Sequence, residues 1–260
     1  MMNVLNSNKD NDEIKVLKKR IRMRIWELME RNNIAIFPRP VYGRIPNFKM
    51  SEVAARRLIE TNVFQKAEVV FVCPDSPQRL IREAVIRMEK TLIMATPKLR
   101  KGFIIIKPRS VPKGLEWKAS TIRGAFKYGK LVNIPEVPID LKVTGSVAVT
   151  LDGARLGKGG GFSDLEYAIL RELGLIDDST PVVTTVHDVQ IVDYIPMTKH
   201  DVPIDYIFTP TRSIRTNVKY EKPKGIYLDE LDKTKIEEIP ILRNIISYKL
   251  RNRKNYNSAY

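Results

Sequence analysis

Five of the thirteen glycines in this 260-residue chain fall between positions 153 and 161, beside basic and acidic side chains. The stretch R-L-G-K-G-G-G-F-S-D (155–164) carries Arg155 and Lys158 ahead of Asp164. Glycine allows positive φ and close approach of a ligand to the backbone amides, at a cost in conformational entropy. A predicted strand precedes the loop and a predicted helix follows it, so amides and the helix N-terminus converge on one spot. The pattern therefore indicates a phosphate-binding loop, with Arg155 and Lys158 supplying positive charge.

Two common phosphate loops are excluded by single residues. A dinucleotide-binding fingerprint that starts at Gly157 requires glycine where Phe162 stands, and a Walker A loop requires Ser or Thr after Gly-Lys, where Gly159 follows. Asp164 begins the predicted helix, next to the proposed phosphates. A carboxylate there repels phosphate unless a cation lies between them, which implies Mg²⁺. The alternative is a tight strand-to-helix turn in which Asp164 only stabilises the helix N-terminus.

Strands and helices alternate along the chain around this loop. Apolar runs predict strands at 68–72, 91–95, 102–106, 143–149, 181–186 and 205–209. Helical spacing predicts helices at 12–32, 51–59, 78–89, 164–173 and 236–250. This alternation predicts an α/β fold with a largely parallel sheet. We expect a disordered N-terminus (1–11), a single domain (12–255), and an insertion of little regular structure at 107–141.

Composition limits the class of protein. The hydrophobic content of 43% and the charged content of 29% are typical of a globular protein, and there is no apolar run long enough for a membrane span. Cys73 is the single cysteine and the first residues are unlike a signal peptide, so we expect a reducing, cytoplasmic setting. The net charge of +15 favours anionic partners, including nucleic acid, although a solvated basic surface explains it equally well.

The segment 152–170 resembles the signature of the 5-formyltetrahydrofolate cyclo-ligase family, which has the form D-x-x-G-x-R-L-G-x-G-x-G-[YF]-Y-D. Other segments resemble the branch of methenyltetrahydrofolate synthetase domain-containing proteins: 37–48, 145–149, 181–193, 205–212 and 239–243. The resemblance implies a three-layer α/β/α sandwich. It also implies a reaction in which MgATP phosphorylates the formyl oxygen of 5-formyltetrahydrofolate, N10 closes the ring, and phosphate leaves from 5,10-methenyltetrahydrofolate.

The resemblance also implies roles for particular residues. The family has a K-x-x-x-R pair on its first helix, which Lys18 and Arg22 match; at this spacing they share one helix face, although a solvated basic face is the alternative. Asp164 and Asp205 match the metal-binding carboxylates, with a strand-end turn as the alternative for Asp205. Arg155 and Lys158 are the candidate catalytic residues. The remaining expected ATP-binding residues belong to the loop: Gly157, Gly159, Gly160, Gly161, Phe162 and Ser163.

The sequence departs from the family pattern at two places, the second of which concerns the folate. Ser163 replaces the second aromatic residue of the signature, and the Glu-Thr pair that follows the family's first strand is missing from C-P-D-S-P-Q (73–78). Asp75 is the candidate replacement for that folate-associated glutamate. The intact loop favours an enzyme acting on a reduced folate or related pterin. The missing pair and the basic charge favour the alternative, a non-catalytic nucleotide- or RNA-binding homologue that retains the fold.

Overall fold

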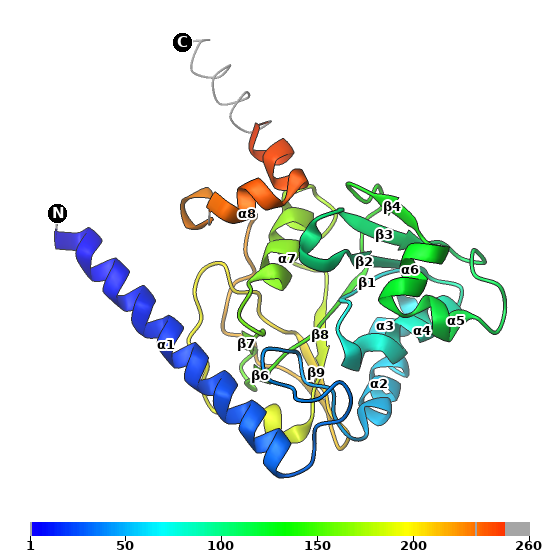
Figure 1. The fold of residues 1–260 in the computed structure, drawn as a ribbon, viewed down its shortest axis with the longest axis horizontal. Coiled ribbons are helices and arrows are strands. Elements are labelled where there is room, and N and C mark those ends of the chain that lie inside the picture. The colour runs from blue at the N-terminus through cyan, green and yellow to red at the C-terminus, as the bar shows by residue number, and fades with distance from the viewer. Residues whose placement is uncertain (1, 232, 248–260) are drawn as a thin grey trace.

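The computed structural model describes residues 2–231 and 233–247, and a mixed sheet forms the centre of this part of the chain (Figure 1). The strand order is β10-β9-β8-β5-β1-β2-β3-β4. The strands are β1 (Val69–Val72), β2 (Thr91–Ala95), β3 (Phe103–Ile106), β4 (Lys130–Val132), β5 (Leu141–Thr144), β8 (Val182–Thr185), β9 (Tyr206–Phe208) and β10 (Ser213–Arg215). The central strands β9, β8, β5, β1 and β2 are parallel, whereas β10, β3 and β4 join antiparallel at the edges. The predicted largely parallel sheet is confirmed.

Both faces of the sheet are covered because apolar side chains point alternately to each side. On β1, Val70 and Val72 pack on one face and Phe71 packs on the other. The first face carries α2 (Ser51–Ile59), α3 (Asn62–Lys66), α4 (Arg79–Arg87), α5 (Glu116–Ala119) and α6 (Ile122–Tyr128). The second face carries α7 (Phe162–Glu172) and the helical residues 240–247, which follow α8 (Lys233–Glu238). This arrangement confirms the three-layer α/β/α sandwich.

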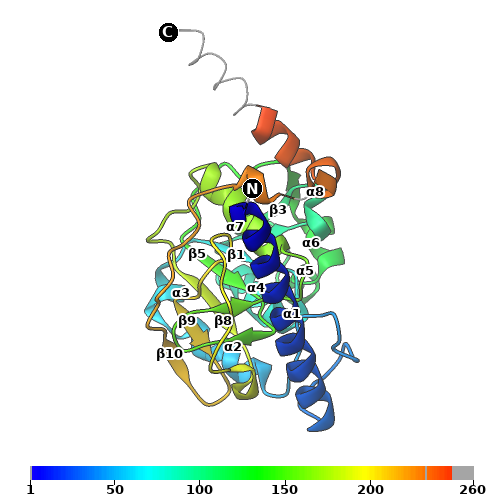
Figure 2. The ribbon, with the colours of Figure 1, turned by 90° about the vertical axis from the view of Figure 1, so that its left-hand side faces the viewer.

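The N-terminal helix α1 (Met2–Arg31) runs along the outside of these layers (Figure 2). Its last turns pack Ile25 and Met29 against the hairpin of β6 (Ala148–Val149) and β7 (Arg155–Leu156). Trp26 Nε1 donates a hydrogen bond to the carbonyl oxygen of Arg44, 3.0 Å away, which fixes the helix to the loop that follows it. Residues 2–11 form the first turns of α1, and the disorder expected for residues 1–11 stays a prediction.

Two expectations need correction. Residues 107–141 are not without regular structure, because they form α5, α6 and the edge strand β4. Gly124 allows α5 and α6 to approach closely, since a Cβ there would lie 1.8 Å from the carbonyl oxygen of Lys118. The strand predicted at 143–149 is divided into β5 and β6. Residues 248–250 of the last predicted helix (236–250) lie outside the described residues, as do residues 248–255 of the expected domain.

The connections that follow β1 and β5 diverge, which leaves a crevice at the carboxyl ends of these two strands. From β1 the chain continues to β2 on one side, whereas from β5 it continues to β8 and β9 on the other side. Such a switch point leaves a gap between the connections above the strand ends, which is where α/β sheets bind their ligands.

Of the helices in 2–231 and 233–247, none combines the length and the apolar character that crossing a membrane requires.

Candidate functional site

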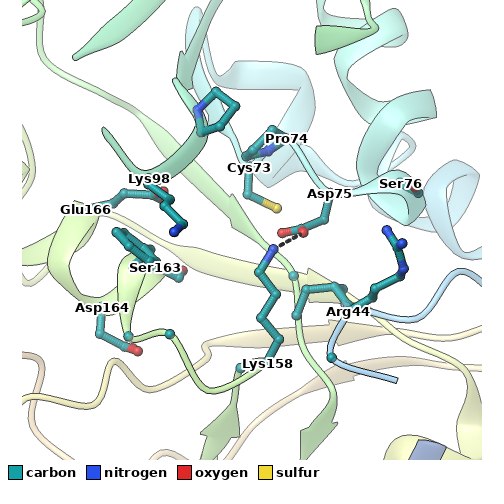
Figure 3. A pocket seen from close by; sticks show the side chains of 18 of the residues that line it. Arg44, Cys73, Pro74, Asp75, Ser76, Lys98, Lys158, Ser163, Asp164 and Glu166 are labelled. Atoms are coloured by element: carbon teal, nitrogen blue, oxygen red, sulfur yellow. Dashed lines mark hydrogen bonds and ion pairs between the residues drawn. The ribbon is translucent and has the colours of Figure 1, made fainter. Parts of the chain in front are cut away.

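A cavity of about 540 Å³ occupies the switch point (Figure 3). We call it the strand-end cavity, because its walls include residues that follow β1 (Cys73 to Ser76), β2 (Thr96 to Lys98) and β5 (Gly145). The glycine loop and the first turns of α7 close the other side. Its lining combines apolar surface with a few charged side chains, which is the usual composition of a small-molecule site.

A second cavity of about 560 Å³ lies between α1 and the glycine loop. We call it the α1 cavity. Lys15, Lys18, Lys19 and Arg22 line it from the helix. It shares four residues with the strand-end cavity: Arg155, Gly157, Gly161 and Asp164. The glycine loop is therefore the border between a basic cavity and a more apolar one.

The loop takes a backbone path that only glycine adopts without strain. Gly159 has φ of +110°, and Gly161 has φ of +66° at the residue that precedes α7. Gly157 lies directly over Arg155, since a Cβ there would come within 3.1 Å of Nη1 of Arg155. Arg22 secures the loop from α1, because its Nε donates to the carbonyl oxygen of Gly157 at 2.7 Å. Burial lowers the pKa of Arg22.

Arg155 lies beneath the loop and is almost completely buried. Its Nη2 donates to Oδ1 of Asp164 at 2.5 Å, and its Nη1 donates to the carbonyl oxygen of Gly145 at 3.1 Å. Burial works to lower the pKa of Arg155, but the Asp164 carboxylate outweighs it and the pKa is raised. Asp164 also accepts the backbone N–H of Val202. Arg155 therefore holds Asp164 at the border of the two cavities.

Lys18 lines the α1 cavity together with Arg22, and the phosphate contact expected for this pair stays a prediction. Nζ of Lys18 lies 2.5 Å from Oδ2 of Asp201, and only 11% of either side chain is exposed. Burial works to raise the pKa of Asp201, but Lys18 and the backbone N–H of Thr198 hold it below its usual value. Asp201 was missed by the sequence analysis, because the segment 197–203 carries no pattern beyond polarity.

Lys158 and Asp75 meet inside the strand-end cavity, where Lys158 extends from the glycine loop toward the end of β1 (Figure 3). Nζ of Lys158 lies 2.9 Å from Oδ1 of Asp75. Burial works to lower the pKa of Lys158, but Asp75 outweighs it, so the pKa is raised and the ammonium is stabilised. Lys158 and Asp75, which the sequence analysis both named as candidate site residues, therefore form an ion pair.

The remaining loop residues lie on the wall that the strand-end cavity shares with α7. Ser163 Oγ is 2.6 Å from Oγ1 of Thr144 at the end of β5, so the residue that replaces the family's aromatic is hydrogen-bonded to the sheet. The Phe162 ring lies beneath Nζ of Lys235 from α8, 5.6 Å from the ring centroid. Gly160 packs on the same ring, with 3.0 Å between a Cβ there and the ring.

Asp205 does not join Asp164, so the predicted pair of metal ligands is wrong. Asp205 immediately precedes β9, and the amino end of a parallel strand lies at the edge of the sheet opposite to its carboxyl end. There Oδ2 of Asp205 accepts the N–H of Val182 at 2.7 Å and lies 2.8 Å from Nζ of Lys222. These contacts support the alternative role at the start of a strand.

The structure also adds a buried charged pair that the sequence analysis missed. Lys142 lies within the central strand β5, and Glu166 lies on α7 and lines the strand-end cavity. The available signal was a lysine in the otherwise apolar run of β5. Burial lowers the pKa of Lys142 and raises the pKa of Glu166 to about 7.

Among the described residues, four carboxylates line the α1 cavity: Asp164, Asp201, Asp229 and Glu230. Asp164 and Asp201 fit Mg²⁺ better, because Asp164 lies on the border with the strand-end cavity, whereas Asp229 and Glu230 both pair with Lys199. No group of three or more His, Cys, Asp or Glu side chains in the described ranges could hold a metal ion by itself. Mg²⁺ takes one or two protein carboxylates and completes its octahedron with water and substrate phosphates. The residues therefore fit Mg²⁺ that arrives with a nucleotide rather than Mg²⁺ alone.

Comparison with known proteins shows the family of the chain. The model of the 5-formyltetrahydrofolate cyclo-ligase family matches residues 14–210, which include α1 from residue 14 onward, the sheet from β1 to β9 and the glycine loop. The chain belongs to this family.

Similar cyclo-ligase family members include "Methenyltetrahydrofolate synthase domain-containing protein" from Homo sapiens, 44% identical over 236 residues, and the protein of that name from Danio rerio, 40% identical over 231 residues. The alignments cover 88% and 86% of this chain but 61% and 60% of those relatives, so the chain spans about three fifths of their length. The solved structure of Aquifex aeolicus 5,10-methenyltetrahydrofolate synthetase has a TM-score of 0.50 at 19% identity, with 83% of this chain and all of that chain covered. This likeness concerns the fold.

Proposed function

We propose that the chain is an ATP-dependent ligase that cyclises 5-formyltetrahydrofolate, or a related reduced pterin, to the 5,10-methenyl form. The formyl oxygen attacks the γ-phosphorus of ATP and ADP leaves. N10 then attacks the activated carbon and releases its proton to solvent, and phosphate leaves as the ring closes. The observation that carries the proposal is the border between the two cavities, since a nucleotide in one and a folate in the other would meet at Arg155, Gly157, Gly161 and Asp164.

The α1 cavity suits the triphosphate. Lys18 and Arg22 approach the glycine loop from α1, and the loop amides precede the N-terminus of α7, whose dipole favours negative charge. Phosphoryl transfer requires mainly positioning and neutralisation of charge on the phosphoryl oxygens. When nucleotide is bound, Lys18 exchanges part of its contact with Asp201 for phosphate. Mg²⁺, held by Asp164 and Asp201, would neutralise charge on the phosphate oxygens.

Lys158 acts from the opposite side of the loop. Asp75 holds its ammonium inside the strand-end cavity, where the proposed folate would bring its formyl group. A preorganised cation there stabilises negative charge on the phosphoryl group as it moves from ATP to the formyl oxygen. Arg155, a candidate catalytic residue from the sequence, contributes instead as a positioning residue, because its guanidinium is committed to Asp164 and Gly145. Cytoplasmic location stays a prediction from the sequence.

The experiment mixes the protein with MgATP and 5-formyltetrahydrofolate and follows the methenyl chromophore. We expect turnover by the wild type, and a loss of ~100–1,000-fold in kcat for Lys158→Ala, the typical cost of losing a preorganised charge contact in the transition state. Lys127→Ala is the matched control, since Lys127 lies on α6 and lines neither cavity.

The net charge of +15 is the observation that favours the alternative, a nucleotide- or RNA-binding homologue. In such a protein the affinity for RNA is distributed over many contacts of Lys and Arg with phosphates, so it falls steeply as the salt concentration rises. Absence of methenyl product from every reduced formyl-folate tested, together with salt-sensitive RNA binding, would replace the enzyme by this alternative.

A further inference from the structure

Of the described side chains that line the strand-end cavity, three are carboxylates. Asp75 is occupied by Lys158, and Asp164 is occupied by Arg155. Glu166 differs, because no described residue donates a hydrogen bond to its Oε2, which is fully buried. An unsatisfied buried acceptor is costly, so native structures retain one chiefly where another group completes it. Glu166 is therefore the carboxylate of this cavity that a ligand could complete.

Lys142 supplies a fixed countercharge behind Glu166. Its Nζ lies 3.7 Å from Oε2 of Glu166, beyond hydrogen-bonding distance, and 3.8 Å from the centroid of the Phe71 ring. Only 1% of the Lys142 side chain and 8% of the Glu166 side chain are exposed. A lysine in the middle of a central strand cannot turn toward solvent, so its charge stays beneath the cavity wall. It favours an ionised Glu166 without donating a hydrogen bond to Oε2.

Other charged groups act on Glu166 from the elements around it. Burial raises its pKa to about 7, and Asp75, after β1, adds to this effect. Lys142 on β5, Arg155 on β7 and Lys158 in the glycine loop oppose it. A ligand that donates two hydrogen bonds favours the ionised form of the carboxyl group.

We propose that Glu166 binds the amino-pyrimidinone edge of the pterin, with Lys142 as its countercharge. The assignment rests on the proposed function. That edge of the ring presents two adjacent donors, N3–H and the 2-amino group, which match the two oxygens of one carboxylate. Glu166 on α7 thereby accepts the hydrogen bonds of the pterin that Asp75 does not accept, because Asp75 is paired with Lys158. Cys73, Pro97 and Phe162 line the same cavity beside Glu166 and offer apolar surface to a flat ring.

Glu166→Gln tests the assignment, because glutamine keeps the shape but turns a donor toward the pterin. We expect the KM for 5-formyltetrahydrofolate to rise about ten- to a hundredfold, the range for a hydrogen bond to a charged group. The KM for ATP should stay within twofold. Asp75→Asn tests the competing assignment. If the KM for the folate rises for Asp75→Asn and not for Glu166→Gln, the proposal is overturned.

A substrate analogue gives a readout that a purely structural role would not change. The wild type should discriminate by tenfold or more against 5-formyltetrahydrofolate whose 2-amino group is replaced by methyl, and Glu166→Gln should lose most of this discrimination. Equal discrimination by both proteins contradicts the proposal. Should Glu166→Gln fold poorly, the double variant Lys142→Met with Glu166→Gln removes both buried charges and is compared in the same way.

Failure of the proposed function is distinguishable from failure of this assignment. If the wild type makes product and Glu166→Gln keeps its KM, only the assignment to Glu166 is lost. If the wild type makes no product, the affinity for 5-formyltetrahydrofolate is measured calorimetrically without ATP. Weaker binding by Glu166→Gln then still supports the contact, whereas equal affinity, or no binding by either protein, overturns it.

Discussion

Replacing Asp164 by asparagine should destabilise the protein even when no metal or nucleotide is bound. From the sequence, Asp164 either serves a metal or only stabilises the N-terminus of the following helix. In the structure its carboxylate is the ion-pair partner of Arg155, whose side chain is 2% exposed. Asp164→Asn therefore leaves a buried guanidinium without its charged partner.

The magnitude follows from the contacts that survive. Breaking a buried ion pair by removing one partner costs about 3–5 kcal/mol. Asparagine retains an oxygen that can accept from Nη2 of Arg155 and from the N–H of Val202, and Asp201 still interacts with Arg155. We therefore expect a loss of about 2–3 kcal/mol, below the usual range for a broken buried pair. At about 2–4 °C per kcal/mol for a chain near this size, Tm should fall by about 5–10 °C.

The assay is thermal and urea unfolding followed by circular dichroism, without nucleotide and with EDTA. Asp178→Asn is the matched control, because Asp178 is an exposed carboxylate that pairs with Arg171 and Lys224, and its loss should change Tm little. A Tm for Asp164→Asn equal to that of the wild type would refute the reasoning, since Arg155 would then not depend on Asp164 for its charge compensation. The metal role is measured separately, as the gain in ATP affinity on adding Mg²⁺, which the variant should lose.

Four further outcomes are expected. MgATP at a hundredfold excess over its Kd should stabilise the wild type by about 2.7 kcal/mol, read as a rise in Tm; no rise at millimolar MgATP would contradict the nucleotide site. Lys18→Met should lower stability at pH 7 but much less at pH 3. The pKa of Asp201 is depressed in the folded state, so the ionised carboxylate stabilises the fold at pH values above its unfolded-state pKa, and this contribution is lost in acid; equal losses at both pH values would contradict the ion pair. Wild-type stability should decline as pH rises from 5 to 7, because the pKa of Glu166 is raised to about 7 and the folded chain binds the extra proton; Glu166→Gln should lose this decline, as urea titrations at several pH values would measure. Gly159→Ala should cost about 1–3 kcal/mol through backbone strain at φ of +110°, with the free energy of unfolding as the readout; a neutral effect would show that the loop relaxes.

The central elements of the fold could be predicted because their signal is local. Strands β1 and β2 are continuous apolar runs, and burial on both faces of a parallel sheet requires such runs. The elements within 107–141 could not be predicted, because α5 and β4 are too short for a periodic pattern. Their stability comes from packing, as in the close approach that Gly124 allows.

The candidate site likewise has features that could be predicted from the sequence and contacts that could not. The glycine loop is a contiguous motif, and Lys18 with Arg22 is an i,i+4 pair on one helix, so both were visible in the sequence. The ion pair of Lys18 with Asp201 joins residues 183 positions apart, and Lys158 with Asp75 joins residues 83 positions apart. Such pairs depend on strand order and on the path of α1, which no local pattern specifies.

The choice between Asp201 and Asp205 illustrates how direction along a strand decides the role of a carboxylate. After β8 the chain leaves the carboxyl edge of the sheet and must return to the amino edge before β9, because the two strands are parallel. Asp201 lies on this connection while it still passes the glycine loop, where Lys18 meets it. Four residues later Asp205 has reached the opposite edge and accepts the first N–H of β8. A carboxylate directly before a parallel strand is therefore a poor candidate for a site at the carboxyl ends, whereas one in the preceding connection is a good candidate.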